Sequence, residues 1–133
     1  MKRILVVEDD PNVLSVVASR LEVSGFAVTV AEDGQKALEQ IYKEKPDLIV
    51  LDLMLPKRDG FSVCNQLKRE KKFCKIPIVM LTARTEPIDI ELGDLVGADL
   101  YITKPFDTKE LIIKIEELIK EAEARADNSD MGN

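Results

Sequence analysis

The sequence contains no histidine and no tryptophan, and only two cysteines, two tyrosines and four phenylalanines occur among its 133 residues. Without histidine, this chain cannot use imidazole for acid-base catalysis, for metal binding or as a phosphohistidine carrier. Cys64 and Cys74 are not spaced like zinc ligands, and we expect both to be reduced thiols with a structural role. Any chemistry must therefore come from carboxylates, hydroxyls and amines.

The chain also lacks a long apolar run and an excess of basic residues. No stretch approaches the roughly 20 apolar residues that a membrane span requires. The apolar start is too short for a signal peptide, because Glu8, Asp9 and Asp10 follow it directly. We therefore expect a cytoplasmic protein without membrane contact. The formal net charge of −6 argues against direct nucleic-acid contact by this chain, since such contact needs a face rich in lysine and arginine.

What the sequence does have is a regular alternation of strand and helix patterns within the length of one domain. Five short apolar runs rich in β-branched residues predict strands at residues 4–7, 26–30, 48–53, 76–81 and 100–103. Four runs are almost continuously apolar, which indicates a parallel sheet covered on both faces. The second run is weaker and is predicted to lie at an edge.

Helical spacing follows each predicted strand. The patterns predict helices from Asp10-Pro11 to Gly25, around residues 37–41 and 63–67, from about Glu86 to Val96, and from Asp107 onward. Residues 124–133 are small and polar, and we expect them to form a frayed tail or a linker. Five strand-helix alternations predict a doubly wound α/β domain with right-handed crossovers.

Polar residues follow four of the predicted strands. Glu8-Asp9-Asp10 follows the first strand, Asp52 ends the third, Thr82 follows the fourth, and Lys104-Pro105 follows the fifth. The carboxyl ends of parallel strands meet at one edge of a sheet, so we expect these side chains to converge. Clustered carboxylates in a crevice repel one another and require a cation. An all-oxygen ligand set suits Mg²⁺, and Mn²⁺ would fit the same ligands.

Asp52 is the best candidate nucleophile in this group. It ends the central strand, where the backbone is most rigid, whereas the adjacent Asp9 and Asp10 suit metal binding. A metal, Lys104 and Thr82 would neutralise the oxygens of a phosphoryl group while the Asp52 carboxylate attacks phosphorus in line. Each residue alone also has a simpler interpretation: Asp10 could cap a helix, and Lys104 could be a solvated charge.

Taken together, these residues resemble the receiver domains of bacterial two-component response regulators. The resemblance covers residues 2–120 and is carried by Glu8-Asp9-Asp10, residues 51–56 with Asp59-Gly60, Leu81-Thr82-Ala83, Gly97-Ala98-Asp99 and residues 101–106. It implies a flavodoxin-like α/β fold, with a five-stranded parallel sheet in strand order 2-1-3-4-5 and five helices. The receiver domain would comprise residues 1–121, and residues 122–133 would be a polar tail or linker stub.

The resemblance implies that Asp52 is phosphorylated by a histidine kinase or a phosphotransfer protein. Asp10, Asp52 and the backbone carbonyl of Met54 would bind Mg²⁺ directly, and Asp9 would assist, through water. The domain would assist its own phosphorylation and dephosphorylation, but it would not be a turnover enzyme acting on an external substrate.

The resemblance also implies a switch. Thr82 and Lys104 would bind the phosphoryl group, with the Lys104-Pro105 peptide bond in the cis form usual for the family. Thr82 would move toward the phosphoryl group and Tyr101 would turn inward, which changes the surface made by the fourth helix, fifth strand and fifth helix. That surface would bind an output partner or a second copy of the chain, forming a homodimer.

Three further positions carry weaker expectations. Met54 and Arg84 lie at positions that border the phosphoryl group in the family and vary among its members. An apolar Met54 cannot orient an attacking water, so we expect a long-lived phosphorylated form. Ile113 lies on the polar side of the last helix, where it marks either a partner surface or an ordinary exposed apolar residue.

Two other functional classes use similar residues. A phosphatase of the haloacid-dehalogenase type needs a second aspartate two residues after its nucleophile, where this chain has Met54. A flavin or nucleotide carrier needs a phosphate-binding loop after the first strand, where Asp9 and Asp10 would repel phosphate. The sequence leaves open whether the receiver stands alone or forms the N-terminal part of a transcription factor whose effector domain lies outside this chain.

Overall fold

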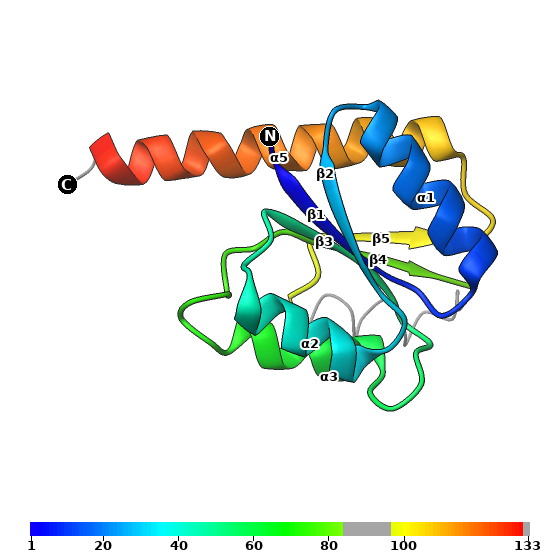
Figure 1. Cartoon of the computed structure of the whole chain (residues 1–133). Helices are drawn as coiled ribbons and strands as arrows, with labels where there is room; N and C mark the ends of the chain where they lie inside the picture. Colours follow the sequence, from blue (N-terminus) through cyan, green and yellow to red (C-terminus); the bar gives the residue numbers. More distant parts are fainter. Residues whose placement is uncertain (84–96, 132–133) are drawn as a thin grey trace.

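The computed structural model describes residues 1–83 and 97–131, with the side chains of Thr82 and of residues 126–131 left out. One parallel sheet runs through the molecule in the order β2-β1-β3-β4-β5 (Figure 1). Its strands are β1 (Arg3–Val7), β2 (Ala27–Ala31), β3 (Leu48–Asp52), β4 (Ile78–Thr82) and β5 (Leu100–Thr103). The predicted parallel sheet, its strand order and the edge position of the second strand are confirmed.

Helices cover both faces of the sheet. Helices α1 (Pro11–Val23) and α5 (Thr108–Met131) lie on one face, and α2 (Gly34–Lys43) and α3 (Gly60–Lys68) lie on the other (Figure 1). The described residues thus contain four of the five predicted helices. The remaining one, predicted at residues 86–96, lies outside the described residues.

Three of the helices begin at aspartates that follow strands closely. The side chain of Asp10 accepts from the amide of Asn12 at the start of α1. Asp33 and Asp59 act in the same way at the starts of α2 and α3. Each cap satisfies an amide that has no partner within its helix, so the sequence fixes where the chain turns from the carboxyl end of a strand into a helix.

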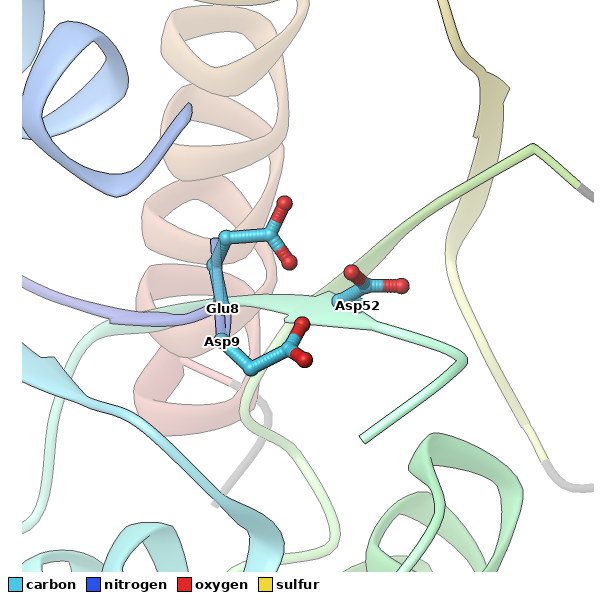
Figure 2. Close-up of side chains that lie close together, drawn as sticks. All are labelled: Glu8, Asp9 and Asp52. Carbon is cyan, nitrogen blue, oxygen red and sulfur yellow. The ribbon is translucent and has the colours of Figure 1, made fainter. Parts of the chain in front are cut away.

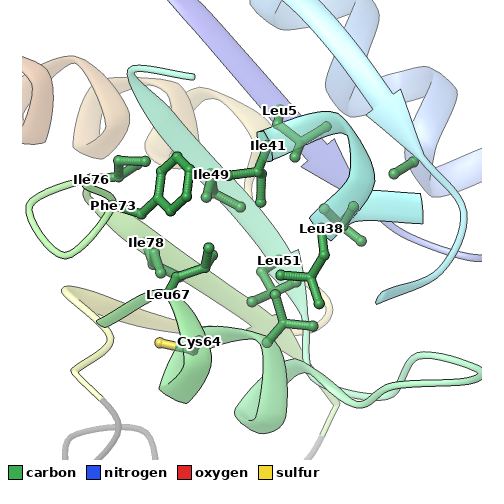
Figure 3. Close-up of a cluster of buried hydrophobic side chains, with 14 of the residues drawn as sticks. Leu5, Leu38, Ile41, Ile49, Leu51, Cys64, Leu67, Phe73, Ile76 and Ile78 are labelled. Atoms are coloured by element: carbon green, nitrogen blue, oxygen red, sulfur yellow. The ribbon is translucent and has the colours of Figure 1, made fainter. Parts of the chain in front are cut away.

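The sheet is buried on both faces because alternate residues of its strands point to opposite sides. Leu5, Ile49 and Leu51 pack toward α2 and α3 (Figure 3), whereas the intervening Val6 and Val50 pack toward α1 and α5. The nearly continuous apolar runs of the sequence are explained by this two-sided burial.

Neither cysteine forms a disulfide bond, and the more deeply buried one belongs to the core. Cys64 has no exposed surface and is part of the cluster between the sheet and the helices α2 and α3 (Figure 3). Burial raises the pKa of the Cys64 thiol to about 12. A thiol with so high a pKa is a weak nucleophile at neutral pH, which agrees with the predicted structural role.

Gly97 and Asp99, from a segment that carried the family resemblance, join α3 to the start of β4. One Asp99 carboxylate oxygen accepts from the amide of Ile78 at 2.8 Å and from Lys68 Nζ at 3.2 Å. Gly97 has a φ of 91°, and a Cβ there would lie 2.9 Å from Lys68 Cγ. These two residues therefore have a structural role, since they hold β4 in the register that places its carboxyl end near Asp52.

Helix α5 is longer than the sequence indicated. Residues 124–131, which we expected to form a frayed tail or a linker, are helical, and the helix extends past the sheet (Figure 1). Ala122, Glu123, Ala124 and Arg125 all have high helix propensity, which outweighs the lack of an apolar face in this stretch. The domain boundary at residue 121 stays a prediction. Among the described residues, no helix combines the length and apolarity that a bilayer span requires.

Candidate functional site

The carboxyl ends of three strands bring together side chains that are far apart in the sequence. Asp52 ends β3, Glu8 follows β1 and Lys104 follows β5. Lys104 Nζ lies 2.9 Å from Asp52 Oδ2 and 2.6 Å from Glu8 Oε1. Glu8 and Asp52 are only 2% and 5% exposed, so this ammonium bridges two carboxyl groups in a partly desolvated crevice.

Three carboxylates share this crevice. One oxygen of each of Glu8, Asp9 and Asp52 lies within 4.8 Å of the others, and the side chains extend into the same space beside the end of β3 (Figure 2). Glu8 and Asp52 are buried, whereas Asp9 is exposed. The exposed Asp9 leaves the group open to solvent on one side, which gives an ion a route of entry.

Asp10 is not one of these three residues, although the sequence analysis expected it to bind the metal directly. Its Oδ1 accepts from the amides of Asn12 and Val13 at 2.9 and 3.5 Å, as the cap of α1. The sequence analysis gave Glu8 no site role. A usable signal was present, because an aspartate before a proline is a typical start of a helix and leaves Glu8 and Asp9 as the acidic pair.

The residues present fit a small hard cation. Three carboxylates against one ammonium leave about two negative charges in the crevice when all four groups are ionised. Oε2 of Glu8 is buried and has no hydrogen-bond partner in the described part of the chain, and such an atom is costly to leave unpaired. An all-oxygen set of this kind suits Mg²⁺.

Burial and charge shift the protonation of two groups in the crevice. Burial, and then the neighbouring Asp52 carboxylate, raise the pKa of Glu8 to about 8, although Lys104 acts in the opposite direction. Burial lowers the pKa of the Lys104 ammonium, but its hydrogen bonds to Glu8 and Asp52 raise it by more, so the net shift is upward. Without a metal, Glu8 therefore carries a proton at neutral pH while Lys104 stays charged.

This raised pKa predicts that the metal-free protein becomes less stable as the pH rises. The folded state holds the Glu8 proton up to about pH 8, whereas the unfolded chain releases it near the ordinary value of 4.5. The Glu8 contribution to stability is complete below that lower value and is lost as the pH rises toward 8. Glu8→Gln should remove this part of the pH dependence, measured as urea unfolding midpoints at several pH values in EDTA. An unchanged pH dependence in Glu8→Gln would contradict the assignment.

The loop between β3 and α3 holds the Asp52 carboxylate from the other side. The amide of Met54 donates to Asp52 Oδ1 at 3.0 Å. The loop is closed by a hydrogen bond from the amide of Gly60 to the carbonyl of Leu53 at 2.8 Å. A Cβ on Gly60 would lie 2.6 Å from the Asp52 carbonyl oxygen, so only glycine allows this closure. The two oxygens of Asp52 thus have different partners, Met54 and Lys104. Metal binding by the Met54 carbonyl stays a prediction.

The structure describes only some of the other residues that the sequence analysis singled out. The backbone of Thr82 ends β4 and pairs with Thr103 of β5, but its side chain is outside the described residues, as is Arg84. The Lys104-Pro105 peptide bond is cis, as the resemblance implied. Tyr101 is half-buried on β5 against the core below α2 and α3. Ile113 is exposed on α5, as expected for its polar face.

Comparisons with known proteins agree with this arrangement. The family model described as the response regulator receiver domain matches residues 4–116. The alkaline phosphatase synthesis transcriptional regulatory protein PhoP of Bacillus subtilis is 46% identical over 132 residues, which cover 99% of this chain and 54% of that protein. The transcriptional regulator RpaA of Synechocystis is 44% identical over 120 residues, 90% of this chain and 50% of that protein. The chain thus spans about half the length of these relatives.

Solved structures resemble the chain over most of its length. A response regulator receiver domain protein from Methanospirillum hungatei superposes with a TM-score of 0.89 at 30% identity and covers 94% of this chain and 98% of that one. A putative response regulator from Chloroflexus aurantiacus gives a TM-score of 0.85 at 33% identity, with 90% and 98% covered.

Proposed function

The chain belongs to the response regulator receiver domain family, and from that membership we propose that Asp52 accepts a phosphoryl group from a histidine kinase or phosphotransfer protein in the presence of Mg²⁺. The observation that carries the proposal is the position of the Asp52 carboxylate. One oxygen accepts from the Met54 amide, the other pairs with the Lys104 ammonium, and two further carboxylates lie beside it.

The proposed reaction moves one phosphoryl group between two proteins. An oxygen of Asp52 forms the new P–O bond while the P–N bond of the donor phosphohistidine breaks, and the electron pair of that bond returns to the imidazole nitrogen. The ammonium of Lys104 lies where it can neutralise charge on the phosphoryl oxygens. Thr82 would assist.

The acidic group supports a proposal about which residues would hold the ion. Asp9 and Asp52 are the proposed ligands, with Glu8 and the Met54 carbonyl beside them, and Asp9 takes the direct role that the sequence analysis gave to Asp10. When bound, Mg²⁺ would supply positive charge against the phosphoryl oxygens and the carboxylates. Binding of the ion would also favour the ionised form of Glu8.

The output of the domain belongs to the same proposal. Phosphorylation of Asp52 adds negative charge beside Thr82 and Lys104 and would change the surface around β5 and α5 through Thr82 and Tyr101. That surface would bind a partner or a second copy of the chain. The relatives are transcriptional regulators, and the chain matches only half of their length. We propose that it regulates transcription through an effector domain outside this chain, without itself being a turnover enzyme.

The requirement for metal gives a direct test of the proposal. The protein is incubated with acetyl phosphate, with MgCl₂ or with EDTA, and intact-mass spectrometry counts the phosphoryl groups that it gains. We expect one added group with MgCl₂ and none with EDTA, because the crevice holds too much negative charge to admit a phosphate without a cation. A gain of phosphate that is equal in both conditions would refute the proposed metal-assisted transfer.

A further inference from the structure

The loop between β3 and α3 contains a strained turn. Lys57 has a φ of 66°, which is rare for a residue other than glycine, asparagine or aspartate. The amide of Arg58 donates to the carbonyl of Pro56 at 2.7 Å across this residue. This combination is the γ-turn with positive φ, a conformation that is rare and strained. A strained turn persists only where its surroundings hold it in place.

Arg58 supplies much of that support, because its side chain begins a hydrogen-bonded chain along α3. The guanidinium donates to Gln66 Oε1 at 2.5 Å and to Ser62 Oγ at 2.6 Å. Gln66 Nε2 donates to the hydroxyl of Tyr42 at 2.8 Å, and that hydroxyl donates to the Glu70 carboxylate at 2.6 Å. Ser62 and Gln66 are four residues apart on one face of α3, and Glu70 lies just beyond the end of that helix. The chain therefore connects the loop to the surface between α2 and α3.

In the hydrogen-bonded chain from Arg58 to Glu70, only one assignment of donors and acceptors is consistent. Arginine has no acceptor, so the Gln66 amide must present its oxygen to Arg58 and its nitrogen to Tyr42. Tyr42 then has only Glu70 as its acceptor, and this hydrogen bond raises the pKa of the Tyr42 hydroxyl. The Tyr42 ring packs edge-on against Phe73, with ring centroids 5.2 Å apart. One end of the chain is thus fixed to the core.

Electrostatics alone do not favour Arg58 in this position. Its guanidinium bonds to Ser62 in the first turn of α3, where the helix dipole is unfavourable for a cation. Its side-chain partners in the described part of the chain are a hydroxyl and an amide, not a carboxylate. A residue that departs from a local preference in this way is expected near a functional site.

The strained turn lies in the short segment that joins Asp52 to α3. Met54, whose amide holds the Asp52 carboxylate, lies three residues before Lys57. On the other side of the loop, Lys57 Nζ lies 3.6 Å from Asp33 Oδ2 at the start of α2. The loop is therefore held by α2 through Lys57 and by α3 through Arg58, and movement of either anchor would displace Met54.

We propose that Arg58, Gln66 and Tyr42 are positioning residues, which hold the β3–α3 loop so that Met54 and Asp52 are presented to the metal. The inference rests on the proposed function, because it assigns these residues to the same metal site. The Tyr42–Glu70 end of the chain lies on the surface, where Tyr42 is 46% exposed. Changes at this end affect the Asp52 site through the loop, without contact with the phosphoryl group.

The affinity for Mg²⁺ alone tests the proposal. The dissociation constant is measured by titrating MgCl₂ into the isotopically labelled protein and following amide NMR signals. Loss of a residue that orients a metal ligand typically lowers the metal affinity ~10-fold or more. In Arg58→Met only one of several ligands, the Met54 carbonyl, would be less well positioned. We therefore expect the dissociation constant for Mg²⁺ to rise roughly threefold to tenfold. Tyr42→Phe should raise it about twofold, and the double variant should match Arg58→Met because both act through one chain.

Arg69→Met is the matched control, since Arg69 is exposed at the end of the same helix and its side chain has no hydrogen bond or ion pair with residues 1–83 or 97–131. Urea unfolding of each variant shows that the protein is folded. Equal dissociation constants for Arg58→Met and Arg69→Met would overturn the positioning role, while phosphorylation of the wild type would leave the proposed function intact. An unchanged dissociation constant for Mg²⁺ in Tyr42→Phe would show that the positioning role stops at Arg58 and does not include Tyr42. A wild type that binds no Mg²⁺ would overturn the proposed function and this inference together.

Discussion

Asp52→Asn is expected to abolish phosphorylation and, in the absence of metal, to stabilise the fold. An amide is not a nucleophile toward phosphorus, so no phosphoryl group should be gained from acetyl phosphate with MgCl₂. The asparagine has one acceptor oxygen, so it can replace only one of the two Asp52 oxygens that accept from the Met54 amide and from Lys104. Lys104 keeps its contact with Glu8 in either case. Removal of one of three clustered carboxylates also reduces their repulsion, and we expect a gain of about 1 kcal/mol in the free energy of unfolding.

Two measurements separate these effects. Intact-mass spectrometry counts phosphoryl groups, and urea unfolding in EDTA gives stability. Asp47→Asn is the matched control, because Asp47 lies at the opposite edge of the sheet, where its carboxylate accepts from the amide of Arg3 at 2.8 Å. This control should gain one phosphoryl group like the wild type and should not gain stability. Phosphorylation of the Asp52→Asn protein at the normal rate would mean that another residue is the acceptor.

The sequence predicted the architecture well because the fold depends on repeated, local patterns. Strands that are buried on both faces must be almost continuously apolar, and this signal marked β1, β3 and β4. The meeting of Asp52 and Lys104 then followed from topology alone, since parallel strands place their carboxyl ends at one edge. Residues 52 positions apart could therefore be assigned to one site before any contact was known.

The ligand assignment within Glu8-Asp9-Asp10 was harder, because three adjacent carboxylates carry no sign of which way each side chain points. At the end of β1 and the start of α1, the structure shows where two of these side chains are directed. Asp10 turns back to cap the helix, and Glu8 reaches Lys104 at 2.6 Å. The helix start was predicted from Asp10-Pro11, although the metal was still assigned to Asp10. The burial of Glu8 could not be predicted, since a glutamate is rarely found in a buried position.

Contacts between different helices were also beyond the sequence. Tyr42 of α2 and Glu70, just beyond α3, are 28 residues apart, and no periodicity links them. Their contact depends on how the two helices pack on the sheet, which is a tertiary property. In the same way, the helix over residues 122–131 was not predicted, because this stretch lacks an apolar pattern and only its first part has high helix propensity.

Lys104→Met is expected to lower both stability and phosphorylation, because Lys104 is the positive charge that pairs with both Glu8 and Asp52. Removal of one partner of a buried ion pair typically costs several kcal/mol, and we expect a loss of about 3 kcal/mol in EDTA near pH 8.5. The phosphorylation rate with acetyl phosphate should fall on the order of 100-fold, since charge on the phosphoryl oxygens loses one partner.

The pH dependence of this loss identifies its cause. Lys104 lowers the pKa of Glu8, so without it Glu8 holds its proton to a higher pH. Near pH 5.5 Glu8 is neutral in the wild type and in Lys104→Met, so only Asp52 loses a counterion. The loss of stability should therefore be smaller near pH 5.5 than at about pH 8.5. MgCl₂ should restore part of the stability at the higher pH.

Lys36→Met is the control for this experiment, because the Lys36–Glu32 pair is exposed on both sides and such pairs contribute less than about 1 kcal/mol. A Lys104→Met protein as stable as this control at both pH values would mean that solvent, and not Lys104, compensates the buried carboxylates. In that case water in the crevice would screen the carboxylates, and the pairing of Lys104 with Asp52 would no longer support Asp52 as the phosphoryl acceptor.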